Sequence, residues 1–204
     1  MGVGPSVVLF DLGGVLFDYD PDRRLQFIAD SADLPSSEVQ ARVFDTDFDQ
    51  RCEAGDLDVQ ASHTEFCRLL GVDWSYETCR DALVSAFKPD GIVFSLAREL
   101  SAVREVASLT NNGQIIKDGL ANLHPEYSSI FADHVYFSSA IGQMKPEPAA
   151  FNAVLEGWAK QPEDVLFVDD SFENVTAAHG LGFHVHRYFD AENLEADLRG
   201  FGLL

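Results

Sequence analysis

The chain has 204 residues, 46% of them hydrophobic, which is enough for one domain with an insertion or for two small domains. Asp and Glu number 34 against 14 Lys and Arg, so the formal net charge is −20 at pH 7. Nucleic acids and anionic membranes are bound through clustered basic residues, so we expect neither as a partner. No stretch approaches the roughly 20 apolar residues that a membrane-spanning helix needs.

The three cysteines, Cys52, Cys67 and Cys79, are odd in number and include no close pair of the kind that binds metals. This pattern indicates reduced thiols in a cytoplasmic compartment, and packing is the role we expect for all three. The sequence leaves the oligomeric state open.

The first predicted element is a strand at Val7–Phe10, because four consecutive apolar residues are typical of a strand buried on both faces of a parallel sheet. Asp11 follows this strand at its C-terminal end, where open α/β sheets place their ligands. Gly13 and Gly14 come next and allow a sharp turn that brings bare backbone close to a bound group.

The next region, roughly Pro21–Phe87, reads as helical without a clear strand. Pro21 is suited to the first position of a helix that has Asp20 as its N-cap. Further helical segments are expected from Pro35, over Val59–Leu70 and over Trp74–Phe87. We therefore expect an inserted helical unit at residues 18–89, and a core made of residues 1–17 and 90–204.

From Ile92 onward, predicted helices alternate with predicted strands, which favours a parallel sheet with right-handed crossovers. The expected strands are Val103–Leu109, His134–Phe137, Val165–Val168 and Phe183–Arg187. The expected helices are Ile92–Leu100, Gln114–Leu123, Glu147–Trp158, Phe172–His179 and Ala191–Leu198, and Ser138–Gly142 reads as a loop. With Val7–Phe10, this gives an α/β fold with a parallel sheet of about five strands.

Four polar clusters lie at predicted strand ends or before a helix: Asp11, Thr110-Asn111, Lys145 and Asp169-Asp170. The C-terminal ends of parallel strands share one edge of a sheet, so these clusters can converge there. Asp11 could act as a nucleophile that accepts a phosphoryl group, with Thr110 and Lys145 holding its oxygens. Asp11 and Asp169 could together hold Mg²⁺, which prefers oxygen ligands.

These residues resemble the four motifs of the haloacid dehalogenase superfamily, in the same order along the whole chain. The first is Phe10-Asp11-Leu12-Gly13-Gly14-Val15, and the second is Leu109-Thr110-Asn111-Asn112. The third contains Lys145 before Pro146, and the fourth is Val168-Asp169-Asp170-Ser171. The segment 18–89 resembles the small helical cap of this superfamily.

The resemblance implies a Rossmann-like three-layer core with an inserted helical cap. It further implies a Mg²⁺-dependent phosphatase that forms an aspartyl phosphate on Asp11 and acts on a small phosphorylated metabolite. The implied metal ligands are Asp11, the Gly13 carbonyl, Asp169 and Asp170. Thr110, Asn111 and Lys145 are the implied substrate-binding residues, and Lys145 is implied to be catalytic together with Asp11.

One position departs from the family pattern. The phosphatases of this superfamily usually have a second Asp two residues after the nucleophile, where it transfers protons, but this chain has Gly13 there. The chain resembles a branch with Asp-Leu-Gly-Gly-Val that is regarded as sugar-phosphate phosphatases. Asp18 or Asp20, just beyond the motif, are the candidates for the missing proton donor.

Two other functions remain open at this point. A 2-haloacid dehalogenase also lacks the second Asp, but it usually has small neutral polar residues in place of Asp169 and Asp170. A non-catalytic binding protein on the same scaffold is supported only by Gly13, and the retained Asp11, Lys145 and Asp169 weigh against it.

Overall fold

The computed structural model describes residues 4–204; residues 1–3, with which the expected core segment 1–17 begins, lie outside this range. Five parallel strands form one sheet in the order β5-β4-β1-β6-β7. The strands are β1 (Val7–Phe10), β4 (Val106–Thr110), β5 (Val135–Phe137), β6 (Val165–Asp169) and β7 (His184–Arg187). The predicted α/β fold with a five-stranded parallel sheet is therefore confirmed.

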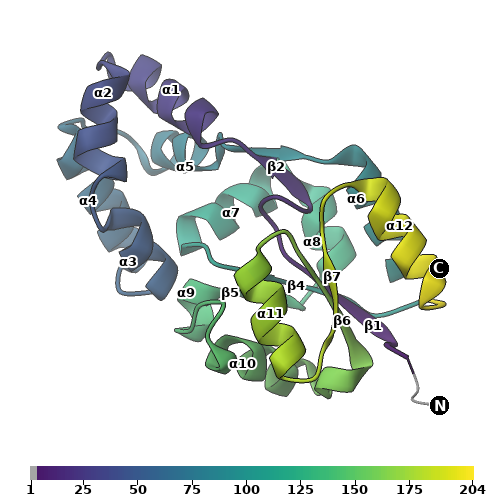
Figure 1. Ribbon diagram of the computed structural model, residues 1–204. Coiled ribbons are helices and arrows are strands. Elements are labelled where there is room, and N and C mark those ends of the chain that lie inside the picture. Colours follow the sequence, from purple (N-terminus) through teal and green to yellow (C-terminus); the bar gives the residue numbers. More distant parts are fainter. Residues whose placement is uncertain (1–3) are drawn as a thin grey trace.

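Helices cover both faces of this sheet, because successive side chains of a strand point to opposite faces. In β1, Val8 and Phe10 pack into one hydrophobic cluster, and Val7 and Leu9 into another. The first cluster includes side chains from α6 (Gly91–Ser101), α7 (Gln114–Leu123), α8 (Pro125–Phe131) and α12 (Ala191–Gly200). The second includes side chains from α10 (Pro148–Trp158) and α11 (Phe172–Gly180). The core thus has three layers (Figure 1).

The strand order reverses beside β1. The chain runs from β1 outward through β4 to β5, and then returns to β6 on the other side of β1. Ligands of open α/β sheets bind at such a switch point, outside the C-terminal ends of the strands. Asp11 directly follows β1 and Asp169 is the last residue of β6, so both lie at this point.

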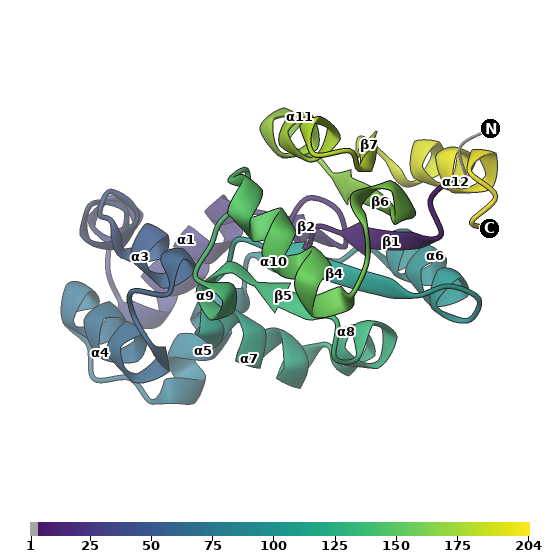
Figure 2. The ribbon, with the colours of Figure 1, turned by 90° about the horizontal axis from the view of Figure 1, so that it is seen from below.

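A group of helices from the region between β1 and α6, here called the cap, gathers at the end of the molecule away from both termini (Figures 1 and 2). Its helices are α1 (Pro21–Ala32), α2 (Ser36–Val39), a π-helical turn (Gln40–Phe44), α3 (Phe48–Ala54), α4 (Val59–Leu70) and α5 (Tyr76–Val84). The Asp20 side chain caps α1 as expected, accepting a hydrogen bond from the Arg23 amide.

Two strands that the sequence did not suggest lie at the two ends of the region expected to be helical. Two short strands, β2 (Phe17–Tyr19) and β3 (Phe87–Pro89), form an antiparallel pair where the chain enters and leaves the cap. The expected helix at Trp74–Phe87 therefore ends early, and its last residue belongs to β3. This pairing joins segments about 70 residues apart, so local periodicity does not reveal it.

Three further differences are local. Val103–Leu109 was expected as a strand, but β4 begins only at Val106, because the amides of Val103 and Arg104 bond to Leu100 and close the end of α6. Ser138–Gly142 forms a helical turn, α9 (Ser138–Ile141), rather than a loop. Helix α8 was not expected, since a Pro and two Ser residues interrupt its apolar pattern.

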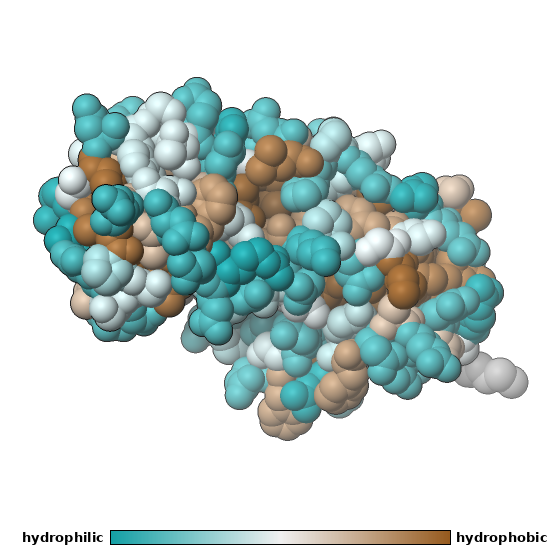
Figure 3. All heavy atoms as spheres, turned by 90° about the horizontal axis from the view of Figure 1, so that it is seen from above, coloured by the Kyte–Doolittle hydropathy of each residue, from teal (hydrophilic) through white to brown (hydrophobic). Residues whose placement is uncertain are grey.

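The face of the molecule in Figure 3 is mostly hydrophilic, with hydrophobic residues in separate small patches, in keeping with the net charge. Within residues 4–204, every helix is too short or too polar to cross a membrane.

Candidate active site

Lys145 lies between the two carboxylates at the switch point of the sheet. Its Nζ is 2.7 Å from Asp11 Oδ1 and 2.6 Å from Asp169 Oδ2. All three side chains are buried, with Lys145 and Asp11 less than a tenth exposed and Asp169 fully enclosed. The convergence expected from the sequence is therefore present, and it places one cation beside two buried anions.

Asn111 holds the Lys145 backbone in place. The Asn111 amide donates to the Lys145 carbonyl oxygen at 2.8 Å, and its Oδ1 accepts from the Lys145 amide at 2.9 Å. The amide nitrogen and the amide oxygen of the Asn111 side chain are thus both bonded to the backbone of Lys145. This geometry favours a positioning role for Asn111 over the direct substrate contact implied by the resemblance.

Asp169 is fixed by donors from the start of α11. Asn174 Nδ2 lies 3.1 Å from each oxygen of the carboxylate, and the Ser171 amide donates to Oδ1 at 2.9 Å. Ser171 also caps α11, accepting a hydrogen bond from the Asn174 amide. These donors fix the orientation of the Asp169 carboxylate at the end of β6.

The site shifts the pKa values of its members. Burial raises the pKa of Asp11 to about 7, against the lowering effect of Lys145, and the nearby Asp169 charge adds to the rise. Burial by itself lowers the pKa of Lys145, but the two carboxylates outweigh it and the net shift is upward. The two carboxylates thus favour the charged form of Lys145, and an ammonium group at this position can bind an anion.

The acidic residues fit a hard divalent cation. Asp11, Asp169 and Asp170 each offer a carboxylate oxygen, and these oxygens lie within 4.8 Å of one another. Gly14 has a φ of +83°, and a Cβ there would lie 2.6 Å from Asp170 Oδ2, so the glycine turn leaves room for this carboxylate. An all-oxygen donor set of this kind suits Mg²⁺.

Thr110 lies at the end of β4 on the same edge of the sheet. Its Oγ1 accepts a hydrogen bond from Asn112 Nδ2 at 2.6 Å, which leaves the hydroxyl proton free to donate. The side chain is almost fully buried, so its orientation is set by its surroundings.

A pocket, here called the sheet-edge pocket, contains most of these groups. Its lining comprises Asp11, Gly13, Tyr19, Glu53, Phe87, Thr110, Asn111, Asn112, Lys145 and Asn174. The residues proposed from sequence for attack and phosphoryl binding therefore face one cavity, and Gly13 lines it too. Asp18 and Asp20 are absent from this lining, and both instead bind Arg23, at 3.1 and 3.3 Å.

Glu53 is the residue of this pocket whose role the sequence did not suggest. It lies near the end of α3, in a stretch that reads as an ordinary turn before Gly55. The pKa of its carboxyl group is raised to about 7, first by burial and then by the nearby Asp49 charge, against the lowering effect of Arg24. Only the placement of the cap over the sheet edge brings this carboxyl group to the site.

A second cavity, here called the cap pocket, adjoins the first and shares Tyr19, Glu53, Phe87 and Asn112 with it. Arg24 binds Asp49 in this cavity through both terminal nitrogens, at 2.7 and 3.0 Å. Arg24 is 5% exposed, and its Nε finds no partner within residues 4–204. Arg24 and Asp49 thus bring a charged pair to the wall of the cap pocket.

The family model for haloacid dehalogenase-like hydrolases matches residues 5–182, and the chain belongs to this family. The chain is 25% identical over 193 residues to D-ribitol-5-phosphate phosphatase of Bacteroides thetaiotaomicron, covering 91% of each protein. A structure of a predicted HAD-like family hydrolase from Porphyromonas gingivalis matches with a TM-score of 0.79 and 26% identity, covering 96% of this chain and 97% of the other.

A HAD family enzyme from Bacteroides thetaiotaomicron, solved in complex with magnesium and inorganic phosphate, shares the fold. Its TM-score is 0.78 at 23% identity, with 90% of this chain and 93% of the other covered.

Proposed function

We propose that this protein is a Mg²⁺-dependent phosphatase that removes phosphate from a small metabolite through an aspartyl phosphate on Asp11. The observation that carries the proposal is the buried Lys145 ammonium between Asp11 and Asp169, with Asp170 completing a carboxylate cluster. The relatives that act on ribitol phosphate or bind magnesium and phosphate support it.

In this proposal, Asp11 attacks phosphorus in line, and the bond between phosphorus and the leaving oxygen breaks. Lys145 and the Thr110 hydroxyl bind the oxygens of the phosphoryl group, and Asn111 positions Lys145. Asp11, the Gly13 carbonyl, Asp169 and Asp170 are the proposed Mg²⁺ ligands. When bound, Mg²⁺ supplies positive charge that reduces the electrostatic repulsion between an anionic substrate and these carboxylates.

The carboxylates disfavour a dehalogenase. A 2-haloacid carries its own carboxylate, and Asp169 and Asp170 lie within 4.8 Å of the Asp11 nucleophile. Three acidic groups would repel such a substrate, whereas a phosphate ester that brings a divalent cation would be tolerated. A non-catalytic role is disfavoured too, because burying these charges costs desolvation free energy and has no evident structural purpose.

A sugar or polyol phosphate fits the cap pocket best. Arg24 brings guanidinium N–H donors to this pocket, and Asp49 and Glu53 bring carboxylate acceptors, which suits a chain of hydroxyl groups. The activity of the ribitol phosphate relative supports this substrate class. We further propose that residues 18–89 open and close as a cap about the β2–β3 pair to admit the substrate.

The test is hydrolysis of p-nitrophenyl phosphate by the wild-type protein, with Mg²⁺ and with EDTA. We expect turnover only with Mg²⁺, and D-ribitol 5-phosphate among the better substrates of a sugar-phosphate panel. Halide release from 2-chloropropionate, measured in EDTA, tests the alternative dehalogenase function. Halide release without phosphatase activity would replace the proposal with a dehalogenase, and inactivity in both assays would support a binding protein.

A further inference from the structure

Gly13 leaves the proposed reaction without a proton donor. Cleavage of an alkyl phosphate needs a proton for the leaving oxygen, and hydrolysis of the aspartyl phosphate needs a base for water. The side chains of Asp18 and Asp20 are 64% and 42% exposed and are bound to Arg23. Neither lines the sheet-edge pocket, so the structure disfavours both candidates that the sequence suggested.

Glu53 is the one carboxyl group that the cap contributes to the sheet-edge pocket within the described residues. Its backbone is anchored to the core, because Ser138 Oγ donates to the Glu53 carbonyl at 2.6 Å. Gly55, at φ +81°, packs so tightly on the Ser139 carbonyl that a Cβ would lie 2.5 Å from the oxygen. These contacts hold the end of α3 against α9, with Glu53 at the pocket.

The surroundings of Glu53 suit proton transfer near neutral pH. The charged groups facing it are Asp49 and Arg24 from the cap, and Asp11 and Lys145 from the core wall of the shared pocket. Burial and Asp49 raise the pKa of Glu53 to about 7, so both protonation states are accessible at neutral pH.

We propose that Glu53 is the general acid and base of the reaction, supplied by the cap in place of the residue missing at Gly13. This inference rests on the proposed phosphatase function. As Asp11 bonds to phosphorus and the leaving oxygen departs, protonated Glu53 gives that oxygen its proton. The Glu53 carboxylate then takes a proton from a water molecule as the water oxygen attacks phosphorus. The bond between phosphorus and the Asp11 oxygen breaks, which releases phosphate and restores Asp11 and protonated Glu53.

The test compares wild type and Glu53→Gln on phenyl phosphate, a poor leaving group, and p-nitrophenyl phosphate, a good one. We expect kcat/KM to fall about 100-fold for phenyl phosphate and far less for p-nitrophenyl phosphate, since only the former needs protonation. Loss of the base should also make p-nitrophenol appear in a burst as phosphoenzyme accumulates. Asp18→Asn and Asp20→Asn serve as controls and should show neither effect.

A second variant separates catalysis from structure. A Cβ at Gly13 would lie 3.6 Å from Tyr19 and Phe87, an ordinary contact distance, so a side chain can begin there without a clash. Adding Gly13→Asp to Glu53→Gln should restore part of the phenyl phosphate rate. Equal losses on both substrates without rescue would overturn the role of Glu53, whereas a wild type inactive on every phosphate would overturn the phosphatase function itself.

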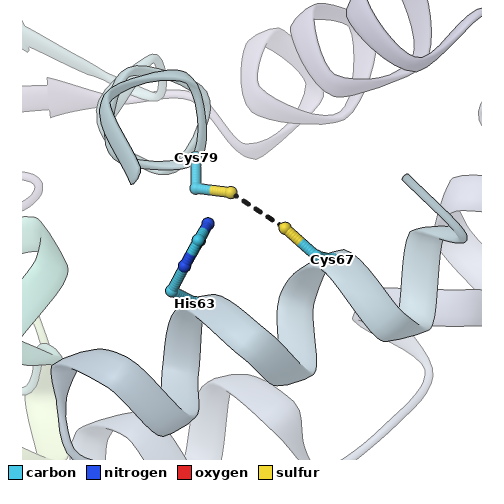
Figure 4. Close-up of side chains that lie close together, drawn as sticks. All are labelled: His63, Cys67 and Cys79. Carbon is cyan, nitrogen blue, oxygen red and sulfur yellow. Dashed lines mark hydrogen bonds between the residues drawn. The ribbon is translucent and has the colours of Figure 1, made fainter. Parts of the chain in front are cut away.

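A different cluster carries an independent inference. His63 and Cys67 lie one turn apart on α4, and Cys79 faces them from α5 (Figure 4). One ligand atom from each lies within 4.8 Å of the others, and the two sulfurs are 3.4 Å apart. The sequence suggested no metal pair, because the cap fold brings together cysteines 12 residues apart.

The spacing of these atoms matches a small tetrahedral site. Two thiolates bound to one Zn²⁺ at about 2.3 Å lie about 3.8 Å apart, close to the observed sulfur separation. The Trp74 carbonyl oxygen is 2.9 Å from His63 Nε2 and 3.8 Å from Cys67 Sγ, which places a fourth ligand atom beside the three. Cys79 is buried, while His63 and Cys67 are partly exposed and leave an entry path.

The geometry points to a Zn²⁺ site of His63, Cys67 and Cys79 that fastens α4 to α5 within the cap. Sulfur and imidazole ligands select zinc rather than magnesium, so this site is chemically distinct from the carboxylate cluster. Metal bound here would stabilise the folded cap, because the ligands come together only in the folded chain.

The test loads the full chain with ZnCl₂, removes unbound metal by gel filtration and measures zinc by mass spectrometry. We expect about one zinc per chain, which falls to near zero in Cys67→Ser and Cys79→Ser and is unchanged in Cys52→Ser. Co²⁺ bound to the wild type should show thiolate charge-transfer absorption, a readout that needs no variant. Absence of that absorption, or a Cys67–Cys79 disulfide in zinc-treated protein, would overturn the inference.

Discussion

The Asp11→Asn variant is expected to lose at least about 10⁴-fold in kcat for p-nitrophenyl phosphate with Mg²⁺. An amide is a poor nucleophile, so the phosphoenzyme cannot form. The substitution is nearly isosteric, and its Oδ1 can still accept the hydrogen bond that Lys145 donates at 2.7 Å. Steady-state hydrolysis measures the loss, and acid quenching of the wild type during turnover should trap phosphate on the protein.

A stability measurement shows whether this loss is chemical. The pKa of Asp11 is about 7 in the folded state, above its ordinary value of 3.8. The free energy of unfolding therefore falls as pH rises from about 4 through 7, because ionised Asp11 is less favourable in the folded than in the unfolded chain. Asp11→Asn removes that charge, so in EDTA at pH 8 its Tm should equal or exceed that of wild type. A clear fall in Tm would mean that the variant is misfolded, and retained turnover would exclude Asp11 as the nucleophile.

The core of the fold was predictable because its elements carry their information locally. Val7–Phe10 and Val165–Val168 are short apolar runs that are each followed by Asp, and each forms a strand at the expected place. Chain order and the rule for parallel strands then predict that Asp11, Lys145 and Asp169 meet at one edge of the sheet.

What the sequence did not reveal depends on contacts between distant segments. The β2–β3 pair consists of two three-residue strands, too short to show a periodicity. Glu53 reaches the site only because Gly55 and the Glu53 carbonyl dock on α9, about 85 residues away. The proximity of Cys67 to Cys79 likewise depends on how α4 packs on α5.

The second large effect that we expect is a loss of both stability and turnover when Lys145 is replaced. Lys145→Met keeps much of the side-chain volume but leaves Asp11 and Asp169 buried without their cation. Breaking a buried ion pair from one side costs about 3–5 kcal/mol, so chemical denaturation in EDTA should show a loss of this size. Turnover should fall as well, because the phosphoryl group loses its fixed positive charge.

Two comparisons identify the unpaired carboxylates as the cause. Mg²⁺ should stabilise Lys145→Met more than it stabilises wild type, because the variant has no other cation to offset its acidic cluster. Adding Asp11→Asn to Lys145→Met should recover part of the lost stability by removing one of the two buried charges. A double variant as unstable as Lys145→Met would instead assign the loss to packing around the lysine stem. In either case the double variant should be inactive, because recovered stability restores neither the Asp11 nucleophile nor the positive charge at the phosphoryl site.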